Sequence, residues 1–450
     1  MKLALWPWRI SFWVQLTVLV YAAYWWWKKR RRPQILVTLS SAYARDVVLA
    51  AAKELGITIG PASCEWADFA RLNWDTFFSD ATTLHRRSSL YLRASLVRKG
   101  MLAYFLAKKG VVDVMPKTLI ADIEDQEDLD HLPRRVSKWM GKESTGDQLA
   151  KKSVESGLVL KASNANRGEH IYLVQSAAEV SAIHSSVLQN VTEWVIQPYL
   201  KSQLLDGRKF HVRCHFVVVG CPRCGASRAW LHDEAVILLA SQPFTEDLTQ
   251  IAAHLTNMCQ QEKHPDYNEG RQILLLSTLK DSKIRPEELW PQFTRHLSAA
   301  LGAAEAGRAG WSPLPQCFEL FGADFLLEEG QQPKAWLLEV NAGPDLAVFG
   351  HKRYAAKRLV RDVLETAVLP FLHLKEEPFL QSDRCFCQVA KGGFFSRELW
   401  SQASTTASPL CELKAFQRRL ENAARLAKEL HSNSKLPLRG PQGEVASRQL

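Results

Sequence analysis

The sequence lacks several patterns that identify common classes of protein. It has no phosphate-loop motif of the form GxxxxGK[ST], so this route to nucleotide binding is excluded. It shows no internal repeat, which excludes solenoid folds. Acidic residues are absent from residues 1–32, which hold seven basic residues, so the net charge of +10 leaves only +3 for the rest of the chain. Because a nucleic-acid groove needs Lys and Arg clustered on one face, we expect no nucleic-acid partner.

Cysteine is scarce for a disulfide-stabilised protein. Nine cysteines are scattered over 450 residues, and an odd number in a chain of this size favours reduced thiols in the cytosol. The motifs CPRC at 221–224 and CFC at 385–387 could together bind zinc, although their spacings do not match. We favour the other interpretation, in which Pro222 and Gly225 form a hairpin turn after the strand FHVRCHFVVV.

One long apolar run stands at the N-terminus. Residues 10–27 form 18 largely apolar positions that end in three tryptophans, and the basic cluster 28–32 follows directly. This length is just enough to cross a bilayer, and the basic cluster predicts a membrane anchor with the rest of the chain on the cytoplasmic side. A mitochondrial presequence and an interfacial helix are the alternatives, which would make the location mitochondrial or cytoplasmic.

The remaining chain alternates short strands with helices, which predicts an α+β fold. A strand at 34–40 and a helix at 45–56 open a small α/β unit near residue 33. One helical region is expected over 90–110, and strands recur at GLVLKAS, HIYLVQ, EWVIQPYL and KFHVRCHFVVV. Towards the C-terminus only residues 413–430 have the spacing of an amphipathic helix, and the last residues have a disordered composition.

Polar residues interrupt two apolar runs in the stretch FELFGADFLLEEGQQPKAWLLEVNAGP. If both runs are strands joined by a turn near Gly330, Asp324 lies diagonally across from Glu339, and Asn341 shares the face of Glu339. Two buried carboxylates at this range repel unless a cation lies between them, so these three residues are candidate metal ligands. Spacing alone leaves a second interpretation open, in which they are surface acids at strand ends.

Two further segments are candidates for binding a phosphorylated ligand. Lys161 closes the strand LVLK, and the small-residue loop that follows contains Arg167 and Gly168, so an ammonium group and loop amides could clamp nucleotide phosphates. The same pattern also fits an ordinary hairpin. In DGRKFHVR, charged residues flank Phe210 on a strand that looks central, which indicates either a ligand cavity or a half-exposed strand.

The order of these elements resembles that of ATP-grasp ligases, and more closely that of the tubulin-tyrosine ligase family. The segments that carry the resemblance are LRASLVRKG, LVLKASNANRGEHIYLV, WVIQPYLKSQLLDGRKFHVR, HLTNMC and FELFGADFLLEEGQQPKAWLLEVNAGP, over residues of roughly 85–370. The resemblance implies an ATP-grasp fold with five parts. These are 1–32 (membrane anchor and basic cluster), 33–90 (N-terminal α/β domain), 91–197 (central domain), 198–372 (C-terminal domain) and 373–450 (helical and disordered basic tail).

The resemblance also implies a role for each candidate residue, with ATP and Mg²⁺ as cofactors. The residues implied to bind ATP are Arg93, Lys161, Arg167, Gly168, Gln197, Tyr199, Leu200 and Lys209, with Arg98 and Lys99 as alternatives to the first. The residues implied to act in catalysis are Lys209, Arg213, His254 and Asn257, with Thr256 beside the last. The residues implied to hold magnesium are Asp324, Glu339 and Asn341.

Three positions depart from the family pattern. The acid inside the motif KF(D)IR is His211 here, and histidine cannot accept hydrogen bonds from a substrate in the same way. An arginine of the next strand aligns with Leu238, and loss of such a cation could lower the rate on the order of a hundredfold. Pro198 replaces a lysine, which removes a backbone donor and a basic side chain. The metal and nucleotide groups therefore match the family, and the acceptor-side groups depart from it.

The activity that the resemblance implies is that of an ATP-dependent carboxylate–amine ligase. Such a ligase joins a free amino acid to a protein carboxylate through an acyl-phosphate, and the implied partner is tubulin or another protein with an acidic tail. Short insertions between the motifs favour the tyrosine-ligase architecture, whereas the positions that distinguish tyrosine, glutamate and glycine cannot be aligned. The alternative is a scaffold or pseudoenzyme of the same fold that binds ATP and magnesium and docks a partner through residues 413–430.

Overall fold

The computed structural model describes three β-sheets and the helices around them. The described residues are 33–61, 64–79, 85–122, 126–139, 157–163, 170–175, 179, 193–221, 227–280, 284–307, 310–311, 313–314, 316–374 and 397–402. Several features expected from the sequence fall outside these ranges and stay predictions. They are the apolar run 10–27, the loop residues Arg167 and Gly168, the turn residues Pro222 and Gly225, the CFC motif at 385–387 and the amphipathic segment 413–430.

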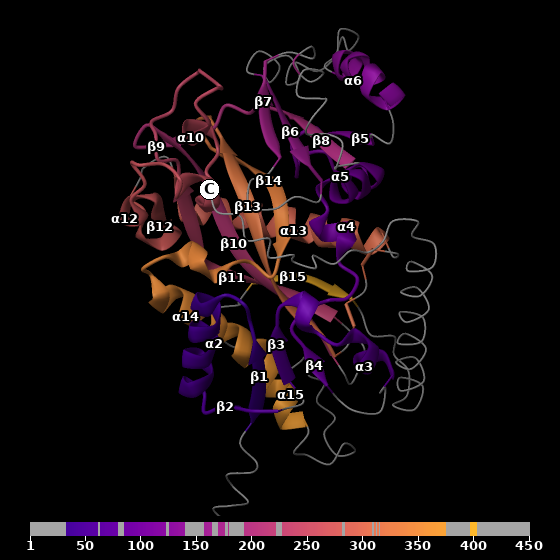
Figure 1. Cartoon of the computed structure of the whole chain (residues 1–450), viewed down its shortest axis with the longest axis vertical. Helices are drawn as coiled ribbons and strands as arrows, with labels where there is room; N and C mark the ends of the chain where they lie inside the picture. Colours follow the sequence, from indigo (N-terminus) through magenta and orange to yellow (C-terminus); the bar gives the residue numbers. More distant parts are fainter. Residues whose placement is uncertain are drawn as a thin grey trace, which may run out of the picture.

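A large antiparallel sheet occupies the middle of the molecule (Figure 1). Its strand order is β12-β11-β10-β13-β14, with β9 paired to β10 and β15 paired to β11. Its strands are β9 (Leu204–Leu205), β10 (Arg208–Gly220), β11 (Ser227–Leu239), β12 (Ile273–Leu275), β13 (Phe318–Glu328), β14 (Lys334–Ala342) and β15 (Arg397–Gln402). Segments that are about a hundred residues apart in the sequence therefore lie side by side as β10 and β13.

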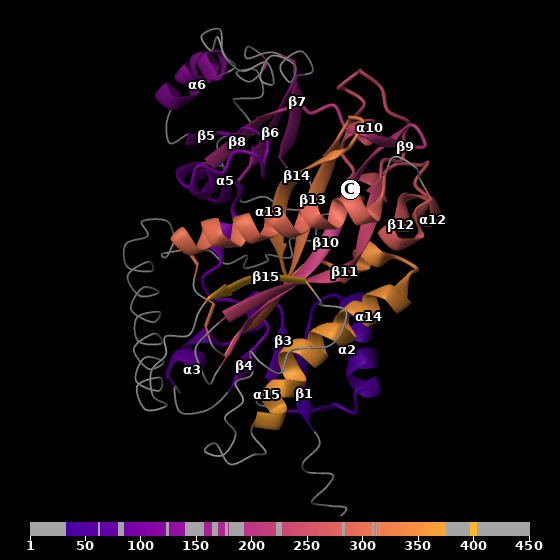
Figure 2. The same ribbon diagram turned by 180° about the vertical axis from the view of Figure 1, so that it is seen from behind.

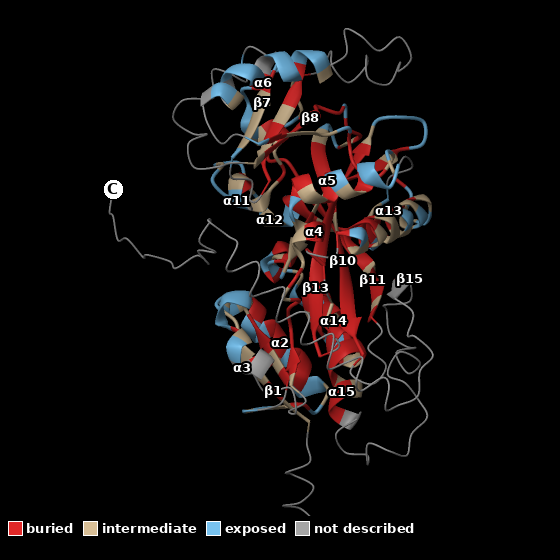
Figure 3. Ribbon diagram, turned by 90° about the vertical axis from the view of Figure 1, so that its right-hand side faces the viewer, coloured by how far each residue is buried: buried red, intermediate tan, exposed pale blue. Residues whose placement is uncertain are grey.

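Helices cover both faces of this sheet. On one face α13 (Pro286–Ala306) crosses the strands, as Figure 2 shows, and Phe293 packs in the same buried cluster as Phe210 and Val212 of β10. The opposite face, with Val217, packs against α14 (Arg353–Val363), η5 (Leu364–Val368) and α15 (Leu369–Leu374). Because both faces are covered, the long strands are buried along most of their length (Figure 3).

A small parallel sheet lies beneath the large one. Its order is β2-β1-β3-β4, with β1 (Gln34–Thr38), β2 (Thr58–Ile59), β3 (Cys64–Ala67) and β4 (Arg86–Arg87). The hydroxyl of Ser41 accepts a hydrogen bond from the amide of Ala44 at 3.3 Å, which caps α2 (Ala42–Glu54). The helix stops before Gly56, whose φ of +69° requires glycine. The strand and helix expected near residue 33 are both present.

A third, antiparallel sheet lies at the other end of the molecule (Figure 1). Its order is β5-β8-β6-β7, with β5 (Leu119–Asp122), β6 (Leu158–Ala162), β7 (Ile171–Val174) and β8 (Glu193–Pro198), and α5 (Lys99–Lys108) and α6 (Gln126–Trp139) beside it. The amide of Gly100 donates to the hydroxyl of Ser163 at 2.9 Å. A Cβ atom on Gly100 would approach the carboxylate of Glu193 to 2.6 Å, so only glycine lets α5 begin this close to the sheet.

The helical region expected over 90–110 is present but is divided into two helices. The segment forms α4 (Ala94–Val97) and α5, and Arg98 between them has an extended backbone with ψ of 120°. The break frees the amide of Lys99 to donate to the carbonyl of Ser163 at 3.3 Å. As a result Arg98 is exposed whereas Lys99 is buried.

Short elements complete the described fold. They are η1 (Phe69–Arg71), α3 (Trp74–Ser79), α10 (Ile251–His254), α11 (Met258–Gln261), α12 (Glu269–Gln272), η3 (Leu276–Thr278) and η4 (Leu346–Phe349). None of the helices in the described ranges is long and apolar enough to cross a membrane. The predicted anchor at 10–27 is not part of those ranges.

Candidate active site

One face of β10 carries the charged residues expected to meet a ligand. Lys209, His211 and Arg213 project from the face opposite Phe210 and Val212, which belong to the core beneath α13. Lys209 and His211 are buried, and β10 lies between β11 and β13 in the middle of the sheet. The interpretation of this segment as a half-exposed strand is therefore wrong.

The paired strands β13 and β14 bring the three candidate metal ligands together. Asp324 lies directly opposite Glu339, not diagonally as expected, because a β-bulge follows Asp324 in the register. The side-chain amide nitrogen of Asn341 lies 3.3 Å from Oδ2 of Asp324 and 3.2 Å from Oε1 of Glu339. Asp324 is 3% exposed, so the alternative of surface acids at strand ends does not hold for it.

Each carboxylate has a basic partner. The guanidinium of Arg213 donates to both carboxylate oxygens of Asp324, with Nη2 at 2.8 Å from Oδ2. Nζ of Lys99, at the start of α5, lies 3.0 Å from Oε2 of Glu339. Gly322 makes room for this arrangement, since a Cβ atom there would lie 2.9 Å from Cδ of Arg213. The site is thus assembled from three elements, β10, the β13–β14 hairpin and α5.

Glu339 is held as an anion by its neighbours. Burial alone would raise the pKa of its carboxyl group, but Lys99 and Lys161 outweigh that effect and lower the pKa from 4.5 to about 2. Burial alone would lower the pKa of the Arg213 guanidinium, but the carboxylate of Asp324 outweighs this effect and raises that pKa. The site therefore contains permanent charges of both signs.

Two lysines of the site lack carboxylates close enough to keep their pKa normal. Burial, assisted by the charge of Lys99, lowers the pKa of Lys161 to about 8 although Glu339 and Asp324 act against this. Burial and the charge of Lys161 lower the pKa of Lys209 to about 7. Nζ of Lys209 lies 4.0 Å from the centre of the Tyr199 ring, a cation–π contact. An anion placed between the two ammonium groups would stabilise their charged forms.

The candidate adenine-side residues form a buried rim next to Lys209. The amide nitrogen of Gln197 donates to the hydroxyl of Thr118 at 2.9 Å, and the hydroxyl of Tyr199 lies 2.7 Å from Nδ1 of His254. Nε2 of His254 lies 2.9 Å from the carbonyl oxygen of Asp247, so it is the protonated nitrogen and Nδ1 accepts from Tyr199. Burial lowers the pKa of His254, which keeps the ring neutral.

His211 and Leu238, the two departures on adjacent strands, are direct cross-strand partners. Nδ1 of His211 lies 2.5 Å from Oγ1 of Thr256, and its Nε2 lies 3.6 Å from Oδ1 of Asp324. Burial lowers the pKa of His211, so the ring is neutral at neutral pH. The two departures from the family pattern therefore fall at one place on the sheet.

Some candidates lie apart from this cluster. Arg93 lies before α4, with Nε 3.5 Å from Glu319 on the opposite face of β13 from Asp324, and its guanidinium covers the ring of Phe69 at 4.0 Å. Lys99, rather than Arg93, is the basic residue of this segment that contacts the site, through the carboxylate of Glu339. Leu200 packs with Leu326 and Trp336 in a small apolar cluster.

Asn257 precedes α11 as its N-terminal residue without a side-chain capping hydrogen bond. No contact of its side chain with the described site residues is observed, so its predicted role in catalysis stays a prediction.

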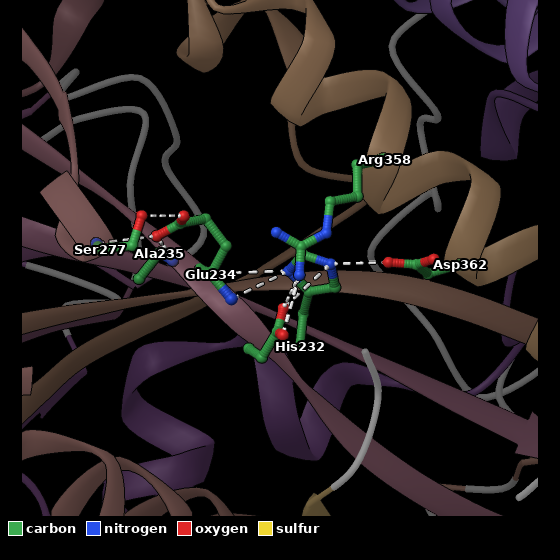
Figure 4. Close-up of polar contacts among 7 residues, drawn as sticks. His232, Glu234, Ala235, Ser277, Arg358 and Asp362 are labelled. Carbon is green, nitrogen blue, oxygen red and sulfur yellow. Dashed lines mark hydrogen bonds and ion pairs between the residues drawn. The ribbon is translucent and has the colours of Figure 1, made fainter. Parts of the chain in front are cut away.

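A polar network that the sequence did not indicate lies on the same face of the sheet. Figure 4 shows Arg358 and Asp362 reaching from α14 towards His232 on β11. Nε2 of His232 lies 3.1 Å from Oδ2 of Asp362, and Nη2 of Arg358 lies 2.9 Å from both carboxylate oxygens of Asp233. Glu234 accepts hydrogen bonds from Ser277 and completes the network. These contacts fix α14 to the sheet behind the site, and no sequence motif predicts them because they join three distant segments.

The donor set of the hairpin fits magnesium. Among the described residues no group of three or more His, Cys, Asp and Glu side chains could hold a metal ion. Two carboxylates and one amide are nevertheless the hard oxygen ligands that magnesium takes, since it completes its shell with water and phosphate oxygens. The amide of Asn341 faces both carboxylates, and rotation of that group by half a turn would present its oxygen instead.

The fold identifies the class of protein. The chain has the ATP-grasp fold, since it superposes on the crystal structure of the C-terminal domain of Kluyveromyces lactis Pby1, described as an ATP-grasp enzyme interacting with the mRNA decapping enzyme Dcp2. The TM-score is 0.54 at 22% identity, and the match covers 79% of this chain and 98% of that chain. The model of the tubulin-tyrosine ligase family matches residues 93–376. The chain belongs to this family, as the motifs between residues 85 and 370 indicated.

Curated relatives carry several family activities in their names. A probable tubulin–tyrosine ligase of Saccharomyces cerevisiae, PBY1, is 23% identical over 358 residues, which cover 67% of this chain and 45% of that protein. A probable tubulin–tyrosine ligase of Schizosaccharomyces pombe is 24% identical over 375 residues, which cover 73% of this chain and 90% of that protein. A probable tubulin polyglutamylase of Bos taurus is 29% identical over 181 residues, which cover 39% of this chain and 38% of that protein. The matched region thus spans less than half of the budding-yeast relative.

Proposed function

We propose that this protein is an ATP- and magnesium-dependent ligase that joins the amino group of a free amino acid to a carboxylate of a protein. The observation that carries the proposal is a cluster of four basic side chains beside a pair of carboxylates. Arg213 and Lys99 pair with Asp324 and Glu339, Lys161 interacts with both carboxylates, and Lys209 lies within the field of Lys161; the pKa of each of the last two lysines is lowered. A site with excess buried positive charge beside an oxygen-rich pair suits a polyphosphate together with a divalent cation.

Each group has a defined task in such a reaction. Lys161 and Lys209 bind phosphate oxygens, and Gln197 and Tyr199 border the nucleotide base. Asp324, Glu339 and Asn341 would hold Mg²⁺, which when bound neutralises charge on the transferred phosphoryl group. Arg213, now paired with Asp324, turns to a substrate carboxylate once Asp324 serves as a metal ligand.

The chemistry balances without a protein nucleophile. An oxygen of the acceptor carboxylate attacks the γ-phosphorus of ATP, and ADP leaves. The amine nitrogen of the amino acid then attacks the acyl carbon, the phosphate group leaves, and the amine proton passes to solvent. The protein contributes the alignment of the two reactants and the stabilisation of negative charge.

The acceptor that we propose is tubulin or another protein with an acidic tail. Relatives of this chain are named as probable tubulin–tyrosine ligases, a probable tubulin polyglutamylase and a tubulin glycylase. These names support tubulin as the first acceptor to test and leave the added amino acid open. We also propose that residues 10–27 anchor the protein to a membrane, with residues 33–450 in the cytoplasm.

A second candidate is a pseudoenzyme that binds ATP and magnesium without transfer. The observation that favours it is the pairing of His211 with Leu238, which leaves no cation at that cross-strand position. A donor missing from the acceptor side would slow the attack on the acyl-phosphate and leave nucleotide binding intact.

One assay separates the two candidates. The full-length protein is given ATP, Mg²⁺, tubulin and each radiolabelled amino acid in turn. The ligase predicts incorporation that disappears in Glu339→Gln and persists in the matched control Glu329→Gln, whose exposed side chain lies on the same hairpin and pairs with Lys201. Binding of ATP without incorporation into tubulin would contradict tubulin as the acceptor. Binding of ATP without incorporation into any acceptor protein would contradict the ligase and favour the pseudoenzyme.

A further inference from the structure

His211 lies between two segments that are distant in the sequence. Its Nδ1 is 2.5 Å from Oγ1 of Thr256, in the segment that joins α10 to α11. Its Nε2 is 3.6 Å from Oδ1 of Asp324 on β13. The side chain of His211 is 5% exposed and that of Asp324 is 4% exposed, so neither contact is shared with bulk solvent. A single ring therefore meets both a candidate metal ligand and the segment that contains His254.

The partners of the two ring nitrogens determine which nitrogen of the neutral His211 ring carries the proton. The carboxylate of Asp324 can only accept a hydrogen bond, so the proton belongs on Nε2, which faces Oδ1 of Asp324 at 3.6 Å and makes no hydrogen bond to any described residue. Nδ1 then accepts from the hydroxyl of Thr256. The cross-strand partner on β11 is Leu238, which offers no competing polar group. The ring is thus a bridge with one donor end and one acceptor end.

The segment on the far side of this bridge is also held by Gln261, which donates to the carbonyl oxygens of Ala252 and Leu255 and accepts from the amide of Ser241. His254 is fixed by Tyr199 and by the carbonyl of Asp247, both on the adenine side of the site. Thr256 lies two residues further on, and its contact with His211 joins the segment to the strand that faces Asp324. This contact is a direct route by which the position of Thr256 can depend on Asp324.

We propose that His211 is a positioning residue that couples the segment around Thr256 to Asp324, so that ordering of this segment and binding of a magnesium–nucleoside triphosphate assist each other. This inference rests on the proposed function, because it assigns Asp324 to the metal. It predicts a defined pattern of non-additive effects, because a bridge fails when either end is removed.

The test uses substitutions that preserve one end of the bridge. His211→Asn keeps a polar atom near the position of Nδ1 and loses the reach to Asp324, whereas His211→Gln keeps one near Nε2 and loses Thr256. Thr256→Val removes the hydroxyl and Thr256→Ser retains it. Thr294→Val is the matched control, since its hydroxyl bonds to a backbone carbonyl within α13. Mg·ATP affinity is measured by calorimetry on the full-length proteins, and thermal unfolding is measured without ligand.

The expected results are specific. His211→Gln and Thr256→Val each weaken Mg·ATP binding roughly three- to tenfold, the effect of one lost hydrogen bond. Thr256→Val adds nothing in the His211→Gln background or in the His211→Asn background, because each has already lost one end of the bridge, and Thr256→Ser binds like the wild type. The unfolding midpoints of the ligand-free proteins show the same non-additivity. Thr294→Val leaves Mg·ATP binding unchanged.

Other results would overturn the proposal, and they separate it from the proposed function. If Thr256→Val weakens binding by the same factor with and without His211→Gln, or if Thr256→Ser is as impaired as Thr256→Val, the bridge has no role and the nucleotide site stands. If the wild type binds no Mg·ATP, the proposed function fails. Non-additive unfolding in that case would make the bridge a purely structural contact.

Discussion

The buried pair between Lys99 and Glu339 gives the sharpest prediction for stability. Nζ of Lys99 lies 3.0 Å from Oε2 of Glu339, and the two side chains are 6% and 15% exposed. Lys99→Met keeps most of the side-chain length and removes the charge. Glu339 would then remain as a buried carboxylate whose nearest partner is gone, which is the costly way to break an ion pair.

The magnitude follows from burial and from the remaining cations. Breaking a fully buried pair lowers the free energy of unfolding by about 3 to 5 kcal/mol. Lys161 still attracts Glu339, and Glu339 is partly exposed, so we expect about 2 to 3 kcal/mol. The pKa of Glu339 lies below its usual value, so its stabilising contribution is full above pH 4.5 and is lost as the pH falls towards 2. The difference between wild type and Lys99→Met should shrink over that window.

Chemical denaturation of the two proteins between pH 7 and pH 3 measures this difference. The matched control is Lys201→Met, which breaks an exposed pair with Glu329 on the same hairpin, where the side chains are 72% and 51% exposed. That control should show no measurable change. Equal effects of Lys99→Met and Lys201→Met, or a difference that does not depend on pH, would refute the reasoning about the buried pair.

Other predictions concern binding, packing and location. Lys161→Met should weaken Mg·ATP binding at least tenfold in calorimetry, because the phosphates lose a buried cation, and Lys161→Arg should recover part of it. Binding of Mg·ATP should weaken as the pH rises above 7, since the pKa of Lys209 is about 7 and only the ammonium form attracts phosphate. The affinity of Lys209→Arg for Mg·ATP should depend less on pH over the same range. Gly322→Ala should lower the free energy of unfolding by about 1 to 3 kcal/mol, because its Cβ would lie 2.9 Å from Cδ of Arg213, whereas Gly302→Ala in α13 should not be destabilising. A fluorescent fusion should mark a membrane only when residues 1–32 are present, and a diffuse signal in both fusions would refute the anchor.

The sequence predicted the parts of the site that depend on strand alternation. Asp324, Glu339 and Asn341 interrupt apolar runs with the period of a strand, and Lys161 closes another strand, so their types and faces could be inferred from local pattern. The family motifs added the order of these parts. Local pattern could not supply the β-bulge after Asp324 that brings Glu339 directly opposite, because a bulge depends on pairing with the partner strand.

Tertiary contacts decided the rest. In the segment LRASLVRKG, the family resemblance implied Arg93 as the phosphate-binding residue, with Arg98 and Lys99 as alternatives. The helix break against Ser163 instead brings Lys99 to Glu339. Glu319 pairs with Arg93, and burial raises the pKa of this carboxyl group to about 7. Such pairings join residues more than two hundred positions apart in the sequence, so local sequence patterns cannot predict them.

The central claim is that the β13–β14 hairpin binds magnesium together with a nucleotide. The most direct measurement is a calorimetric titration of the full-length protein with ATP, with and without Mg²⁺, for the wild type and Glu339→Gln. We predict that Mg²⁺ tightens ATP binding to the wild type at least tenfold and that Glu339→Gln loses this gain and still binds ATP through its lysines. A wild type whose ATP affinity does not respond to Mg²⁺, or a Glu339→Gln variant that keeps the full response, would contradict the account.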